Sequence, residues 1–327
     1  MSHKSIFFVL LMFPIGFTFG QTIIKDKQTQ YPVSYATISF GNGFGLFADD
    51  EGKFVFTKKS YPDVDSLFVS ALGYKTLPVA TSNLPSILFM ETQIDELNEV
   101  IIRTKIDRKF KEEVLKPYLD DDYYHCWLPT IESEIAVFFP NENDQDKKIA
   151  TVHFPITLES KNWEKRKKKN SEKQRFSTLF KVKFYHNNQG FPGKELIYEN
   201  IVFRATEKGG DVYNLDVSRY DILVPDNGFF VSLQVLGYTD DEGKLLPNKK
   251  YKEIKTGGDI VKIPTNFRPL LPFTDEIPEN RTYVKRVFVN DNEWSRFEKG
   301  SDVQSGLLKA GLNNYGIGLT FNVYQDK

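Results

Sequence analysis

The residues best able to do chemistry stand together between Asp120 and Trp127, in the stretch DDDYYHCW. Carboxylates, an imidazole and a thiol are metal ligands, and aromatic side chains can stack on a sugar ring. The competing interpretation is structural, because aromatics also anchor a linker at a domain junction while acids face solvent. We favour the structural interpretation, and we keep Tyr123, Tyr124 and Trp127 as candidate binding residues.

Nucleophilic catalysis is not indicated by the adjacent pair His125 and Cys126. Neighbouring residues on a strand point to opposite faces, so the two side chains would diverge. Cys126 is the only cysteine, which excludes an intrachain disulfide. No histidine has the acid spacing of a zinc carboxypeptidase, and the chain contains no Gly-x-Ser-x-Gly, P-loop or GxGxxG motif. We therefore predict no catalytic residue, no metal and no cofactor.

A strongly basic stretch, KNWEKRKKKNSEKQRF, occupies residues 161–176. It could bind an anionic polymer or lipid headgroups. It could equally be the solvated end of a long hairpin, whose charges discourage edge-to-edge aggregation. We favour the hairpin end and keep Lys167, Lys168 and Lys169 as candidate binding residues. A basic loop without interleaved aromatics is not typical of nucleic-acid binding, and the net charge of −1 gives no general attraction to nucleic acid.

The pentapeptide DDEGK occurs twice, at residues 49–53 and 240–244. The tripeptide LGY also occurs twice, but it follows the first DDEGK and precedes the second, so the chain is not a duplication. A calcium loop needs ligands at alternating positions, whereas these acids are consecutive. A glycine directly after the acids is typical of a tight turn. We predict two turns.

The elements that must position these residues are mostly strands. The chain has 28 Phe and 16 Tyr among 327 residues, and aromatics favour pleated, half-buried surfaces. Short β-type runs fill residues 22–102 and return over 131–327, which predicts an all-β protein of two sandwiches, the second larger and compatible with a jelly roll. Residues 245–272 lack a pattern and are expected to form a long loop. Within the linker, residues 103–130, the four-residue spacing of Ile106, Phe110 and Val114 predicts an amphipathic connector helix.

The N-terminus has the features of an export signal. Lys4 precedes an apolar run, Ile6–Phe19, and small residues then lead to a cleavage site before Gln21. A transmembrane anchor is the alternative, but the run is short and contains Pro14 and Gly16. We therefore predict a cleaved signal peptide, residues 1–20, and export to the periplasm or the outer-membrane periphery.

Four blocks within residues 22–102 occur in the order of a known family: PVSYATI, DDEGKF, DSLFVSALGYK and ELNEVII. This quarter of the chain resembles a carboxypeptidase-like regulatory domain of exported Bacteroidetes proteins. The resemblance implies a transthyretin-like sandwich of about seven strands without catalytic residues. Such domains accompany peptidases or the N-termini of TonB-dependent outer-membrane receptors. The short first strand, which lacks the usual glycine, departs from the pattern.

The sequence therefore predicts an exported, non-catalytic protein of the cell envelope that binds a protein or glycan partner. One alternative is a hydrolase of peptides or glycans whose site in residues 131–327 has no readable motif, since catalytic acid pairs are recognised only in space. Another is an accessory subunit of a TonB-dependent uptake complex, with an outer-membrane receptor as partner.

Overall fold

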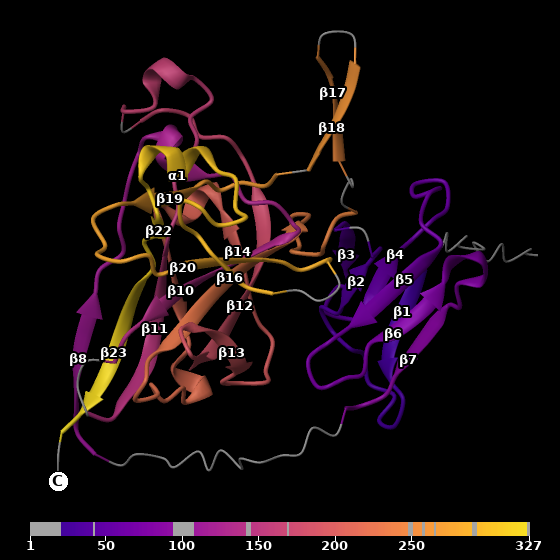
Figure 1. Cartoon of the computed structure of the whole chain (residues 1–327), viewed down its shortest axis with the longest axis horizontal. Helices are drawn as coiled ribbons and strands as arrows, with labels where there is room; N and C mark the ends of the chain where they lie inside the picture. The colour runs from indigo at the N-terminus through magenta and orange to yellow at the C-terminus, as the bar shows by residue number, and fades with distance from the viewer. Residues whose placement is uncertain are drawn as a thin grey trace, which may run out of the picture.

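The computed structural model describes residues 21–41, 43–93, 108–141, 145–168, 170–247, 251–256, 259–264, 266–289 and 293–325. Strands dominate these residues, and α1 (Gly306–Ala310) is the α-helix among them, so the predicted all-β class is confirmed (Figure 1). The predicted signal peptide, residues 1–20, lies outside the described residues. Within them, no helix has the length and apolar character needed to cross a membrane.

Residues 21–93 form a small sandwich of two sheets. One sheet has the order β4 (Lys53–Val55), β1 (Gln21–Asp26), β7 (Ile87–Met90), and the other β3 (Gly45–Phe47), β2 (Thr37–Ser39), β5 (Ser66–Ser70), β6 (Leu77–Ala80). Alternate residues of β1 are buried, as expected for a strand with one face on a core. Ile24 from the first sheet and Ile38, Leu67 and Val69 from the second are fully buried in the shared core.

The larger sandwich packs a seven-stranded sheet against a four-stranded one. The first has the order β13 (Phe191–Glu195), β12 (Ser177–Asn188), β16 (Phe229–Tyr238), β10 (Ser133–Phe139), β20 (Thr282–Arg286), β21 (Ser295–Arg296), with β14 (Ile201–Thr206) also paired to β12. The second has the order β15 (Val212–Asp216), β11 (Lys147–Pro155), β23 (Gly318–Tyr324), β8 (Phe110–Leu115). Phe203 stacks between Phe154 and Phe180, with both pairs of ring centroids 5.3 Å apart, so rings from both sheets fill the core.

The prediction of a long loop over residues 245–272 was wrong. The strands β17 (Tyr251–Thr256) and β18 (Asp259–Pro264) form a hairpin that projects at the top of Figure 1. Further along, β19 (Leu271–Thr274) pairs with β9 (Cys126–Trp127) and β22 (Asn314–Tyr315). A hairpin satisfies its backbone by pairing alone, so it need not carry the apolar alternation that marks a half-buried strand.

The predicted connector helix was also wrong where the structure describes it. Phe110 and Val114 lie on β8, which pairs antiparallel with β23, while Ile106 lies outside the described residues. A spacing of four is one helical turn, but it is also two strand repeats, so the pattern did not distinguish the two. The strand β8 ends one side of its sheet, and all six of its residues are exposed (Figure 1).

The two sandwiches are joined by close contacts around Phe288, which is fully buried. Its ring lies 5.2 Å from that of Phe47, and its carbonyl accepts hydrogen bonds from Ser39 Oγ at 2.8 Å and from the backbone N–H of Gly43 at 3.2 Å. A Cβ on Gly45 would lie 2.4 Å from the Phe288 ring. The joint therefore requires a residue without a side chain at position 45.

Both DDEGK stretches are turns of the same construction, as predicted. In each, the backbone N–H of the first aspartate donates to the carbonyl of the lysine four residues later, and the aspartate Oδ1 accepts from that lysine's N–H at 2.7 Å. Gly52 and Gly243 have φ of 70° and 91°, which glycine adopts without strain. The two turns meet across the joint and line a hollow of about 270 Å³ with Tyr35 and Leu179.

Candidate functional site

A hollow of about 630 Å³ in the larger sandwich unites the two sets of residues singled out in the sequence. Tyr123 lines it from one side, and Lys167 and Lys168 line it from the basic loop. The rest of the polar wall consists of the cations Arg166 and Lys173 and the acids Asp120, Asp121 and Asp211. We call this hollow the basic pocket.

An aromatic cluster borders the basic pocket. The ring centroid of Trp163 lies 4.9 Å from that of Tyr123 and 5.5 Å from that of Tyr124, both edge to face. The Arg166 guanidinium lies 3.8 Å from the Trp163 ring centre. Tyr124 is 78% exposed and Trp163 is 40% exposed, so both present ring surface to solvent. Cationic and aromatic groups are therefore available together.

The basic loop closes in a short local hairpin, but it does not end a long one as predicted, because the flanking strands β11 and β12 lie in different sheets. Ser160 and Lys173 form an antiparallel bridge, and the backbone N–H of Lys161 donates to the carbonyl of Glu172 at 2.9 Å. A 3-10 turn at residues 163–165 follows Asn162, whose side chain accepts from the backbone N–H of Glu164. This closure holds Trp163 beside the tyrosines.

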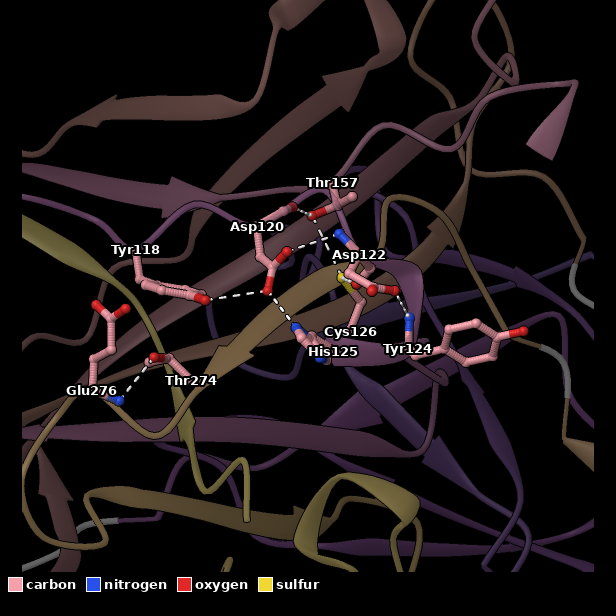
Figure 2. Close-up of polar contacts among 9 residues, drawn as sticks. All are labelled: Tyr118, Asp120, Asp122, Tyr124, His125, Cys126, Thr157, Thr274 and Glu276. Atoms are coloured by element: carbon pink, nitrogen blue, oxygen red, sulfur yellow. Dashed lines mark hydrogen bonds and ion pairs between the residues drawn. The ribbon is translucent and has the colours of Figure 1, made fainter. Parts of the chain in front are cut away.

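Asp120 organises the floor of the basic pocket (Figure 2). Its carboxylate accepts from Tyr118 OH at 3.1 Å and from the Asp122 N–H at 2.8 Å, and it pairs with His125 Nδ1 at 2.7 Å. Its backbone carbonyl accepts from Thr157 Oγ1 at 2.6 Å. Burial opposes ionisation, but these donors outweigh it and hold the pKa of Asp120 below its usual value.

The Cys126 thiol faces away from His125, as Figure 2 shows. Its Sγ donates to the Asp122 carbonyl at 3.3 Å and lies 3.5 Å from Thr157 Oγ1. Burial raises the pKa of Cys126 to about 12, so the sulfur is protonated near neutral pH. Because the thiol donates to the Asp122 carbonyl and turns away from His125, the geometry favours an inert thiol.

The remaining candidate residues lie elsewhere. Trp127 does not line the basic pocket; its ring packs 5.6 Å from Phe273 and 5.2 Å from Phe297. Lys169 lies outside the described residues. No cluster of three or more His, Cys, Asp or Glu side chains suited to a metal occurs among the residues that the structure describes.

Arg166, which lines the basic pocket, and Trp163, which borders it, were not kept as candidates because the basic loop was interpreted as lacking interleaved aromatics. Trp163 and Arg166 are three residues apart, and this spacing within a turn allowed the guanidinium to stack on the indole. The Arg166 Nε is buried and has no hydrogen-bond partner. The sequence signal was therefore a tryptophan followed by an arginine inside the basic run.

A second charged cluster is buried on the seven-stranded sheet, centred on Glu134, which is 1% exposed. Its Oε1 accepts from Tyr185 OH and Ser232 Oγ, both at 2.7 Å, and its Oε2 lies 3.4 Å from Lys285 Nζ. Burial opposes ionisation, but Lys285 and Lys183 outweigh it, so the pKa of Glu134 falls to about 2. The cluster is consistent with a structural ion pair.

Comparison with known proteins gives no family. The sequence matches no protein-family model, and no curated protein is similar to it. Among solved structures, the chain is similar to the cysteine protease and lectin-like domains of Cwp84, a surface-layer-associated protein of Clostridium difficile, with a TM-score of 0.29 and 11% identity. The match covers 58% of this chain and 32% of that one, so this chain spans about a third of that structure.

Proposed function

We propose that the chain is an exported, non-catalytic binding protein of the cell envelope, and that its basic pocket binds an acidic glycan. The observation that carries this proposal is the stack of Arg166 on Trp163 beside Tyr123 and Tyr124. A sugar ring with a carboxylate or sulfate needs both an apolar surface and cations.

The charges of the pocket favour an anionic ligand. Arg166, Lys167, Lys168 and Lys173 outnumber the three acids that share the wall, and Asp120 already accepts from three donors. The buried Arg166 Nε lacks an acceptor among the described residues. A buried donor without a partner is costly, so an acceptor would relieve it.

A non-catalytic role is supported by the state of the groups nearest the pocket. The Cys126 thiol is protonated, donates to the Asp122 carbonyl and turns away from His125. A hydrolase would need a free base or nucleophile that faces the ligand. The rival hydrolase function predicts that the bound glycan is cleaved.

We also propose that residues 22–102 are a carboxypeptidase-like regulatory domain and that export brings it to the envelope. Strands β1 to β7 in sheets of three and four are compatible with the seven strands that this family implies. An outer-membrane receptor is the protein partner we propose. Envelope fractionation followed by crosslinking tests the export and the receptor partner. Recovery only in the cytoplasm would contradict export, and crosslinks to no outer-membrane receptor would contradict the proposed partner.

The glycan test is calorimetric titration of the mature chain with a polyuronate and with a neutral glucan of equal length. We expect binding of the polyuronate alone, and about ten-fold weaker binding for Arg166→Gln or Tyr124→Ala. The double variant Lys299→Gln/Lys309→Gln removes two exposed charges elsewhere and serves as the control. Equal affinity for all three variants, or equal binding of the neutral glucan, would refute the proposal. Release of reducing ends would instead support the hydrolase.

A further inference from the structure

The outer edge of β8 has unsatisfied pairing capacity. The strand is last in its sheet, and no described residue pairs with its free side. Phe110, Val114 and Leu115 are 50%, 55% and 48% exposed. Edge strands are usually protected by charged side chains, proline, a bulge or a covering segment, because their free N–H and C=O groups recruit other strands. The strand β8 carries charges, but they are of both signs, Lys111 beside Glu112 and Glu113, so a strand with the complementary order can pair with it. The strand itself, FKEEVL, contains no proline and no bulge in its pairing with β23.

We propose that a second copy of this chain occupies this edge, so that β8 pairs antiparallel with its counterpart across a two-fold axis. With the axis perpendicular to the sheet, residues that share a face in one copy meet residues of that same face in the other. This symmetry permits only registers in which one residue of β8, the centre, lies opposite its own copy at the axis. Residues equally far before and after the centre then lie opposite each other, so the side chains can be compared pair by pair.

The register centred on Glu112 is complementary. It places Phe110 opposite Val114 twice and Lys111 opposite Glu113 twice. Aromatic–β-branched pairs and opposite charges are both stabilising across strands, at about 0.2–1 kcal/mol each. The unfavourable contact is Glu112 against its own copy at the axis, and Leu115 lies opposite Lys109 without an apolar partner. A shift to a centre at Lys111 or Glu113 would also place two like charges at the axis, and it would lose both the Phe110–Val114 and the Lys111–Glu113 pairs.

The two faces of β8 fit this arrangement. Phe110 lies opposite Tyr324 on β23, with ring centroids 5.8 Å apart, and Val114 lies on the same face. In the dimer, the two Phe110–Val114 pairs would therefore lie on the face that packs on Tyr324, on either side of the Glu112 pair at the axis. Lys111 and Glu113 share the opposite face. The occupant we infer is a second copy because the strand complements itself.

The test is sedimentation velocity of the full mature chain over a hundred-fold range of concentration. We expect a monomer–dimer equilibrium. Lys111→Glu and Glu113→Lys should each weaken the dimer by roughly ten-fold, because each reverses two symmetry-related pairs. The double variant Lys111→Glu/Glu113→Lys restores both pairs and should regain the original affinity. Glu112→Gln removes the repulsion at the axis and should tighten the dimer by about two- to five-fold.

The exposed position of β8 makes these variants safe for folding, and thermal unfolding monitored by circular dichroism verifies this. Lys309→Glu, on an exposed residue of α1, is the matched reversal and should leave the dimer unchanged. A monomer at every concentration would overturn the proposal. So would a dimer that tolerates both single reversals, or a double variant that stays as weak as the singles. The basic pocket plays no part in these readouts, so their failure leaves the glycan proposal intact.

Discussion

Replacing Glu134 with Gln should destabilise the protein by about 3 kcal/mol at pH 7. The side chain keeps its size but loses the charge that Lys285 and Lys183 compensate. The pKa of Glu134 is about 2 in the folded chain and 4.5 ordinarily, and each unit corresponds to about 1.4 kcal/mol. Removing one partner of a buried ion pair also leaves the other charge uncompensated, an effect of about 3–5 kcal/mol in other proteins.

The same pKa difference fixes how this loss depends on pH. A carboxyl whose pKa is lowered by folding stabilises the protein above its unfolded pKa and loses that contribution as the pH falls through the folded value. For Glu134 this window runs from 4.5 down to about 2. The difference between wild type and Glu134→Gln should therefore fall to about 40% of its pH 7 value at pH 3 and to about a tenth near pH 2.

The assay is urea unfolding of wild type and Glu134→Gln at pH 7, 5 and 3. Glu242→Gln, at an exposed side chain, is the control and should change the free energy of unfolding by less than about 0.5 kcal/mol at each pH. A difference for Glu134→Gln that is the same at pH 3 and pH 7 would refute the electrostatic account. Burial lowers the pKa of Lys285 despite the attraction of Glu134, so burying these charges itself costs free energy. The stability lost in Glu134→Gln therefore measures the effect of leaving Lys285 without its partner, not the net contribution of the whole cluster to folding.

Three further results are expected. Gly45→Ala should destabilise the protein by about 1–3 kcal/mol, because the added Cβ would clash with Phe288. Gly306→Ala is the control and should cause no such loss, because a Cβ there meets no atom within 4 Å. Thermal unfolding of the two variants measures the difference. Phe288→Ala should lose about 3–5 kcal/mol in urea unfolding, and a loss below 1 kcal/mol would show that its contact with Phe47 is dispensable. Cys126 should react slowly with iodoacetamide at pH 8 until the chain is denatured; rapid labelling of the native protein would contradict the burial of its thiol.

The strands and turns were predictable because their signals are local. Alternating burial along β1 and the glycines at positions 52 and 243 follow from residue type and spacing alone. The connector was misassigned because Phe110 and Val114 satisfy the periods of both a helix and a strand, and pairing with β23 decides between them. That pairing joins residues about two hundred positions apart, so the residue types within 110–115 alone do not indicate it.

The candidate site was predictable only in pieces. Tyr123 and the lysines of the basic loop were recognised separately, but their meeting depends on the bridge between Ser160 and Lys173. Trp163 lies about forty positions from Tyr123 and Tyr124 in sequence, and the fold brings the three rings together. Trp127 has the same residue type but faces the interior, because β9 pairs with β19 and turns its ring onto Phe273.

The joint at Phe288 has a consequence for how this protein can be rearranged. Domains that follow one another on a flexible connection can be exchanged by recombination, because each carries its own complete surface. Here Phe47 completes the core of the larger sandwich, and the second sandwich inserts a ring where the first must carry Gly45. An N-terminal sandwich from another protein would leave the Phe288 ring without its packing partner unless it supplied both Phe47 and Gly45. The two halves are therefore expected to be inherited and engineered as one piece.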